Sequence, residues 1–153
     1  MNDPDHVLVR KAVEADLGSV ALLFDAYRQF YGFKSDREAA VQFLRRRLEM
    51  GDSVLLVAEM PNHDIAGFAQ LYHGLSSLGM AATMIMNDLF VVPEYRGKGI
   101  AVHLLGAAKD EAKTAEIKTL SLSTQADNQV ARTLYERDGW ILDNDFIHYQ
   151  ATL

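Results

Sequence analysis

A basic, glycine-containing loop lies between an apolar run and a helical pattern in this sequence. The apolar run covers residues 84–92, and the loop follows as Arg96, Gly97, Lys98 and Gly99. Glycines let backbone N–H groups approach a ligand without a Cβ in the way, and a helix start adds unpaired N–H donors and a positive dipole end. The two cations add fixed positive charge beside these donors. The stretch predicts a buried strand leading into an anion-binding turn, which suits two neighbouring phosphates better than one carboxylate.

Several folds bind phosphate with such a loop, and the sequence argues against two of them. A P-loop needs Ser or Thr directly after its lysine, but Gly99 follows Lys98. A dinucleotide-binding loop needs a third glycine and an acidic residue about twenty positions further on. Val102 takes the place of that glycine, and residues 119–122 carry no carboxylate. An ordinary strand-to-helix turn with surface cations is the structural alternative at this point.

Composition narrows the classes of function further. A chain of 153 residues fits a single domain over residues 1–153 with a sizeable core. The absence of cysteine excludes disulfides, a thiolate nucleophile and a thiolate metal site. The five histidines show no zinc-ligand spacing, so we expect no metal. A net charge of −6 argues against nucleic acid as the main partner and suits a cationic small substrate. No apolar run approaches the roughly 20 residues of a membrane span, and the acidic start does not resemble a signal peptide. We therefore expect a cytoplasmic protein that does not bind membranes.

Periodicity and turn signals predict an alternation of helices and strands. We expect strands at residues 6–11, 53–59, 65–72, 84–92 and 118–123, with a terminal antiparallel pair at 140–142 and 146–153. We expect helices at residues 17–31, from the capping-box spacing at 35–38 to 50, after the glycine loop to about 115, and at 128–138. Asp16 is expected to cap the first helix, and residues 74–79 are expected to form a loop.

Two motifs connect this pattern to a known family. Arg96, Gly99 and Ala101 satisfy Arg/Gln-x-x-Gly-x-Gly/Ala, so the loop resembles the pyrophosphate loop of the general N-acetyltransferase (GNAT) superfamily, which binds acetyl-coenzyme A. The segment from Asn128 to Trp140, with Gly followed by an aromatic residue, looks like the family's C-terminal motif. The order of elements also matches, so the resemblance covers nearly the whole chain. It implies an α/β fold with a central mixed, mostly antiparallel sheet, a parallel splayed strand pair and about four flanking helices.

The resemblance also implies where acetyl-coenzyme A would bind. Backbone groups of the strand before the loop would pair with pantetheine, and Asn128 would hydrogen-bond it, although an Asn here is also a good N-cap. Tyr135 occupies the family's usual general-acid position, with packing as the alternative. The residues expected to contact the cofactor are Leu89, Phe90, Val91, Arg96, Gly97, Lys98, Gly99, Ile100, Ala101, Asn128 and Tyr135.

Polar residues inside an apolar strand indicate the acceptor site. Asn87 and Asp88 are adjacent, and because neighbours in a strand point to opposite faces, neither is simply the solvent side of an amphipathic strand. An unpaired buried carboxylate is costly, so we expect Asp88 to face a cleft and to be catalytic. Pairing with an arginine or capping of a loop is the alternative. Tyr27 and Tyr31 lie in the last turns of the first helix and are candidates for lining the acceptor site, with core packing as the alternative.

The acceptor itself is suggested by a finer resemblance. Residues 87–91, with Tyr-x-x-Phe-Tyr at 27–31, are most similar to the branch of spermidine/spermine and histone/polyamine acetyltransferases. That branch often has an acid where this chain has Asn87, which cannot accept a proton, so relay through water to Asp88 or Glu94 stays open. We expect direct acetyl transfer from acetyl-coenzyme A to a primary amine, first a small cationic amine or polyamine. Lysine or peptide acetylation, aminoglycoside acetylation and a non-catalytic coenzyme A-binding module are the alternatives. The family also suggests a homodimer.

Overall fold

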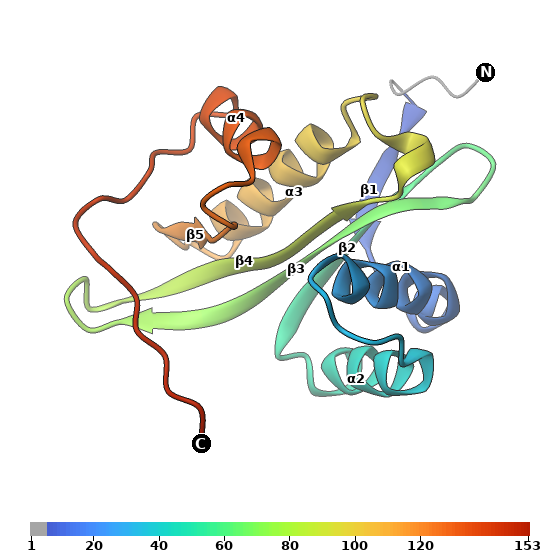
Figure 1. The fold of residues 1–153 in the computed structure, drawn as a ribbon, viewed down its shortest axis with the longest axis horizontal. Coiled ribbons are helices and arrows are strands. Elements are labelled where there is room, and N and C mark those ends of the chain that lie inside the picture. Colours follow the sequence, from blue (N-terminus) through green and yellow to red (C-terminus); the bar gives the residue numbers. More distant parts are fainter. Residues whose placement is uncertain (1–5) are drawn as a thin grey trace. The chain divides into compact units, whose positions relative to one another are not determined.

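A computed structural model describes residues 6–153 and divides the chain into two compact units. The first unit ends at Ser123, and the second comprises Thr124–Leu153. The first is built on one five-stranded sheet with the order β1-β2-β3-β4-β5 (Figure 1). Its strands are β1 (Leu8–Lys11), β2 (Ser53–Glu59), β3 (Ile65–Ser76), β4 (Ala81–Val91) and β5 (Leu120–Leu122).

Neighbouring strands are antiparallel from β1 to β4, whereas β4 and β5 are parallel. The parallel pair requires a crossover, and α3 (Ile100–Thr114) supplies it. The sheet is therefore mixed and mostly antiparallel with one parallel pair, as the sequence predicts.

Helices cover both faces of this sheet. Residues of α1 (Leu17–Phe30) and α2 (Arg37–Met50) share a buried cluster with Leu55, Val57 and Phe68. The intervening strand residues point to the other face, where a Cβ on Gly67 would lie 3.2 Å from Leu104 of α3. Figure 1 shows α3 on one side of the strands and α1 with α2 on the other. The face toward α1 and α2 is the one that carries the polar residues of interest.

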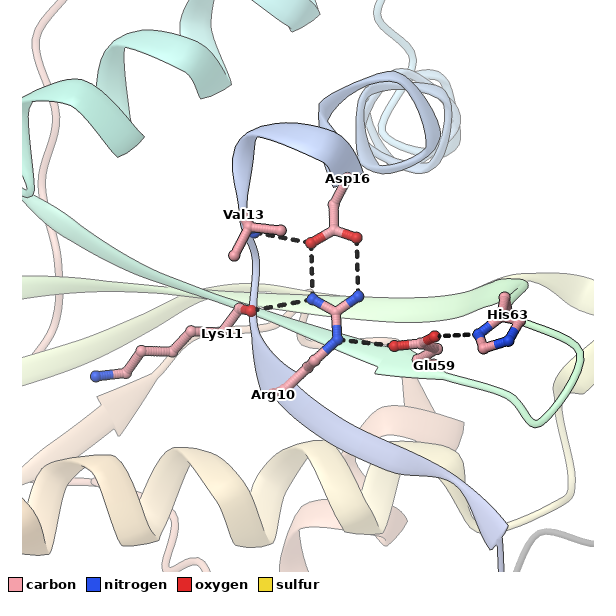
Figure 2. A network of polar contacts seen from close by, with 6 residues as sticks. All are labelled: Arg10, Lys11, Val13, Asp16, Glu59 and His63. Carbon is pink, nitrogen blue, oxygen red and sulfur yellow. Dashed lines mark hydrogen bonds and ion pairs between the residues drawn. The ribbon is translucent and has the colours of Figure 1, made fainter.

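A polar network joins β1 to the start of α1 and to β2 (Figure 2). The Arg10 guanidinium donates to both oxygens of Asp16, at 2.7 and 2.9 Å, and its Nε donates to Glu59 at 2.7 Å. Nδ1 of His63 lies 2.7 Å from the other oxygen of Glu59. Asp16 also accepts from the Val13 N–H at 2.7 Å. Asp16 therefore stands at the N-cap position of α1, as predicted, but its side chain makes no capping bond to the helix, because this carboxylate is occupied by Arg10 and by the preceding turn.

The α1–α2 connection is held by a buried carboxylate. Asp25 accepts from the Ser35 hydroxyl at 2.6 Å, from the Asp36 N–H at 2.8 Å and from Gln29 at 3.1 Å. The N-cap of α2 is Asp36, which accepts from the Ala39 N–H at 3.0 Å. The capping residue therefore lies one position after the predicted Ser35, because Ser35 is bound to Asp25.

Two further expectations differ from the structure. The β3–β4 hairpin continues through residues 74–76 and 81–83, where a longer loop was expected, and the connecting turn is short. The second unit contains α4 (Gln129–Arg137), but its described residues 140–153 form no strand, so the predicted terminal pair is wrong. Two strands alone are marginally stable in water, and the apolar side chains Ile141 and Tyr149 are 92% and 89% exposed.

Candidate active site

A β-bulge in β4 shapes the centre of the candidate site. Leu71 pairs with Met86 and Gln70 pairs with Asp88, so Asn87 is the extra residue. The carbonyl oxygen of Asn87 accepts a hydrogen bond from the Tyr27 hydroxyl at 3.3 Å. The expectation that Asn87 and Asp88 point to opposite faces is wrong, because Nδ2 of Asn87 donates to Oδ1 of Asp88 at 3.0 Å. The bulge breaks the alternation and brings the two side chains together.

Asp88 is buried beneath this bulge. Its exposed fraction is 4%, whereas Asn87 is exposed, so the Asp88 carboxylate lies below the surface and the expectation that it faces a cleft stays a prediction. Oδ2 of Asp88 accepts from Nε2 of Gln70 at 3.0 Å. Burial raises the pKa of the Asp88 carboxyl, and hydrogen bonds from Gln70, Asn87 and Tyr27 act against that rise. Its partners are thus neutral donors, and the predicted alternative of an arginine pair is not what the structure contains.

Three tyrosines surround the carboxylate electrostatically. The rings of Tyr27 and Tyr31 meet edge to face with centroids 5.1 Å apart, and Tyr27 also packs against Phe68. Burial and the charge of Asp88 raise the pKa of Tyr31. The same two causes raise the pKa of Tyr72 to about 12. The Tyr27 hydroxyl bonds the Asn87 carbonyl next to Asp88, and Tyr72 lies two positions after Gln70, which pairs with Asp88. Asp88 and the three tyrosines therefore lie in the same part of the sheet face.

Sequence reasoning missed Gln70, Tyr72 and Ser53, although a signal was present. Gln70 interrupts an apolar strand just as Asp88 does, and Tyr72 lies two positions later on the same face. Ser53 donates its hydroxyl to Oε1 of Gln70 at 3.1 Å. What the sequence could not supply is the β3–β4 register that places Gln70 opposite Asp88.

The sheet splits beside the bulge. The parallel ladder between β4 and β5 ends where Met86 pairs with Leu122, while β4 continues to Val91. Within residues 6–153, the predicted backbone positions Leu89, Phe90 and Val91 therefore have no strand partner on the β5 side. This edge can accept an extended ligand by strand-like pairing.

The glycine loop lies directly after β4 and a short 3-10 turn, Pro93–Tyr95. Gly97 and Gly99 both have left-handed backbones, with φ of 72° and 77°, and a Cβ at either position would meet nothing within 4 Å. Gly99 is the N-cap of α3 and has no side chain to accept a hydrogen bond. The first backbone N–H groups of the helix, such as those of Ile100 and Ala101, therefore receive no side-chain cap. The open space and these donors form a cradle for an anion.

The two cations of the loop are held in different ways. Nε of Arg96 donates to the Val91 carbonyl at 2.8 Å, so this side chain also fastens the end of β4. Nζ of Lys98 lies 5.2 Å from the centre of the Tyr95 ring, and the Tyr95 hydroxyl donates to Asp64 at 3.0 Å. The β2–β3 turn that contains Asp64 is therefore linked to the glycine loop.

The second unit carries the remaining predicted residues. Oδ1 of Asn128 accepts from the Ala131 N–H at 3.1 Å, so Asn128 is the N-cap of α4. Tyr135 lies on the same helix with its ring centre 6.3 Å from that of Trp140. Nε1 of Trp140 donates to Asp138 at 2.9 Å.

Residues 6–153 contain no group of three or more His, Asp or Glu side chains placed to hold a metal ion. No helix in the described part of the chain has the length and apolar character needed to cross a membrane.

Comparison with known proteins agrees with this geometry. The sequence model of the acetyltransferase (GNAT) family matches residues 20–140. The chain is 46% identical over 141 residues to an uncharacterized N-acetyltransferase, YhfO, of Bacillus subtilis, covering 92% of this chain and 94% of that protein. It is 30% identical to a probable acetyltransferase of Haemophilus influenzae over 87% of this chain and 89% of the relative. The crystal structure of a probable acetyltransferase superposes with a TM-score of 0.89 at 36% identity, covering 95% of this chain and 97% of that one. The chain has the GNAT fold and belongs to the GNAT family of acetyltransferases, enzymes that use acetyl-coenzyme A as cosubstrate.

Proposed function

We propose that this acetyltransferase transfers the acetyl group directly to a primary amine of a small cationic molecule, with polyamines and other small alkylamines first. The observation that supports this most is the buried Asp88 carboxylate grouped with Tyr27, Tyr31 and Tyr72. A carboxylate attracts an ammonium, and tyrosine ring faces hold cations. The net charge of −6 acts in the same direction over a longer range.

The proposed acceptor does not need to reach Asp88 itself. Tyr27 and Tyr31 are half-buried and Asn87 is exposed, so these side chains offer the outer contacts. Asp88 lies beneath them and supplies the negative charge. In a buried setting that charge is screened less by solvent than a surface carboxylate would be.

The same carboxylate suits proton removal. An alkylammonium has a pKa of about 10.4, and only the neutral amine attacks a thioester, so one proton must leave first. Burial raises the pKa of Asp88 toward the range in which a carboxylate is a useful base. The Tyr27 hydroxyl, which bonds the Asn87 carbonyl and also lowers the pKa of Asp88 by hydrogen bonding, provides a path from the surface to Asp88. Asn87 cannot take the proton, and the exposed Glu94 is the alternative acceptor through water.

The glycine loop fits the pyrophosphate of acetyl-coenzyme A. The pyrophosphate would lie in the open space beside Gly97 and Gly99, held by the start of α3 and by the charges of Arg96 and Lys98. The β4 edge at residues 89–91 would pair with pantetheine. When bound, the cofactor supplies an activated acetyl group as a thioester.

We further propose, from the family resemblance, that Tyr135 gives a proton to the thiolate that leaves and that Asn128 contacts pantetheine while it caps α4. Tyr135→Phe keeps the ring and removes the proton. We expect turnover to fall about 10²–10⁴-fold with little change in the Kd of acetyl-coenzyme A. Wild-type turnover in this variant would mean that water protonates the thiolate.

The experiment that tests the acceptor is thiol release from acetyl-coenzyme A, measured with polyamines, lysine and other amino acids, short basic peptides and aminoglycosides. We expect the highest kcat/KM with polyamines or small alkylamines, lysine side chains second and aminoglycosides third. Asp88→Asn should weaken the chosen amine far more than it weakens acetyl-coenzyme A. A neutral or anionic best substrate, or unchanged amine affinity in Asp88→Asn, would contradict the proposal.

A further inference from the structure

A line of buried polar side chains crosses three strands toward the site. Ser53 of β2 bonds Gln70 of β3, and Gln70 bonds Asp88 of β4. Gln70 has no exposed surface and stands among apolar neighbours such as Phe68 and Leu71. Burial of an amide is unfavourable unless its groups are hydrogen-bonded, so the bonds to Ser53 and Asp88 are what make this buried position tolerable for Gln70.

The direction of the Gln70 amide is set by the Asp88 carboxylate, which can only accept hydrogen bonds when it is ionised. The Ser53 hydroxyl lies 3.1 Å from Oε1 of Gln70, and Nε2 lies 3.0 Å from Oδ2 of Asp88. A flipped amide would point Oε1 at the carboxylate, placing two acceptors against each other. It would also point Nε2 at the hydroxyl of Ser53. The Asp88 carboxylate thus decides the orientation, and the Ser53 hydroxyl, which can donate or accept, satisfies Oε1 of Gln70.

We infer that Gln70, supported by Ser53, is a positioning residue for the acetyl transfer: it fixes the Asp88 carboxylate under the bulge and favours its ionised form. This inference rests on the proposed role of Asp88. Gln70 contacts neither substrate, since it is fully buried. It acts through the carboxylate alone.

The groups that face Asp88 make Gln70 the decisive donor. Asn87 on the same strand is exposed and free to exchange its bond with water. From α1, Tyr27 and Tyr31 face the carboxylate, and from β3, Tyr72 does so. Gln70 is the one fully buried donor among these described partners, so its hydrogen bond is the one that water cannot replace.

The test is the pH dependence of kcat/KM for the best amine in Gln70→Met, which keeps an unbranched side chain of similar size without a donor. Loss of a hydrogen bond to the Asp88 carboxylate disfavours its ionised form, so the acidic limb of the pH profile of kcat/KM should move to higher pH. At a fixed acidic pH, each pH unit of that shift lowers kcat/KM tenfold, while kcat/KM on the alkaline side should approach the wild-type value. A merely structural defect would lower activity equally at every pH.

Two further variants keep the test decisive. Ser53→Ala, at a partly exposed position, should move the limb in the same direction by a smaller amount. Gln29→Met is the matched control, because it removes a Gln donor from the buried carboxylate of Asp25, at 3.1 Å, and should leave the limb in place. In NMR, the signal of the Asp88 carboxyl carbon can be assigned because it is lost in Asp88→Asn. This signal should titrate at higher pH in Gln70→Met than in the wild type.

The outcomes separate this inference from the proposed function. If Asp88→Asn has wild-type kinetics, the proposed function fails and the inference fails with it. If Asp88→Asn is impaired but Gln70→Met shifts neither the rate limb nor the NMR titration, only the inference is overturned. An NMR shift without a change in the rate limb would likewise overturn it.

Discussion

The surroundings of two buried carboxylates of this chain shift their pKa values in opposite directions. Asp25 is 2% exposed, and the hydroxyl of Ser35, followed by the Asp36 N–H, lowers its pKa. Asp88 is 4% exposed, and burial raises its pKa despite three neutral donors. Asp25 also has a cation nearby, with an Arg28 nitrogen 3.9 Å away. The balance between desolvation and hydrogen bonding thus differs between the two carboxylates, in agreement with a stabilising role for Asp25 and with the role proposed for Asp88.

Asp25→Asn should destabilise the fold in a pH-dependent way. The new NH₂ would face one of three donors, which costs about 1–3 kcal/mol at neutral pH. Because the folded-state pKa of Asp25 is lowered, its contribution is present above the usual value of 3.8 and is lost as pH falls through the folded value. Urea unfolding at neutral pH and again at about pH 3 checks this, since the deficit should shrink in acid. A deficit of equal size at both pH values would contradict the assignment.

At the scale of elements, the connection between the β2–β3 turn and the glycine loop is open to test. Tyr95→Phe keeps the ring under Lys98 and loses the bond to Asp64, whereas Tyr95→Leu loses both. A cation–π contact at a partly exposed site contributes about 0.5–1 kcal/mol, so Tyr95→Leu should weaken acetyl-coenzyme A binding roughly two- to fivefold. Calorimetry with both variants checks this. Equal binding by wild type and Tyr95→Leu would show that Lys98 does not depend on Tyr95.

The glycine cradle has a matched control within the chain. Gly99→Ala and Gly51→Ala each place a Cβ at a left-handed position, with φ of 77° and 60°, that has open space around it. Both should lose similar stability, about 1–2 kcal/mol from the left-handed backbone. Only Gly99→Ala should weaken acetyl-coenzyme A binding, because only its Cβ enters the proposed phosphate cradle. Equal cofactor affinity in the two variants would mean that the pyrophosphate lies elsewhere.

The elements themselves were largely predictable, since periodicity, glycines and prolines are local signals. The centre of the site was not, because it depends on pairing between strands. The bulge at Asn87 follows from the register that sets Gln70 against Asp88, and no local pattern reports a register. The expected strands at 140–142 and 146–153 failed for a similar reason, as β-prone residues do not reveal whether a partner strand is available.

At the scale of the whole molecule, the family match spans residues 20–140 and therefore includes parts of both compact units. Tyr135 and Asn128, for which roles are proposed, are in the second unit, and Asp88 and the glycine loop are in the first. The expectation of a homodimer stays a prediction. Light scattering at assay concentration checks it, and a monomeric mass would contradict it.

We expect this enzyme to have two separable sites, a glycine loop for acetyl-coenzyme A and the Asp88 group for a cationic amine. The most direct measurement is a matrix of initial rates over both substrate concentrations for wild type, Gly99→Ala and Asp88→Asn. We predict that Gly99→Ala raises the KM for acetyl-coenzyme A and leaves the KM for the amine nearly unchanged. Asp88→Asn should instead raise the KM for the amine or lower kcat, and it should leave acetyl-coenzyme A binding intact. If both variants change the same substrate parameter, or if Asp88→Asn is indistinguishable from wild type, the division into these two sites is wrong.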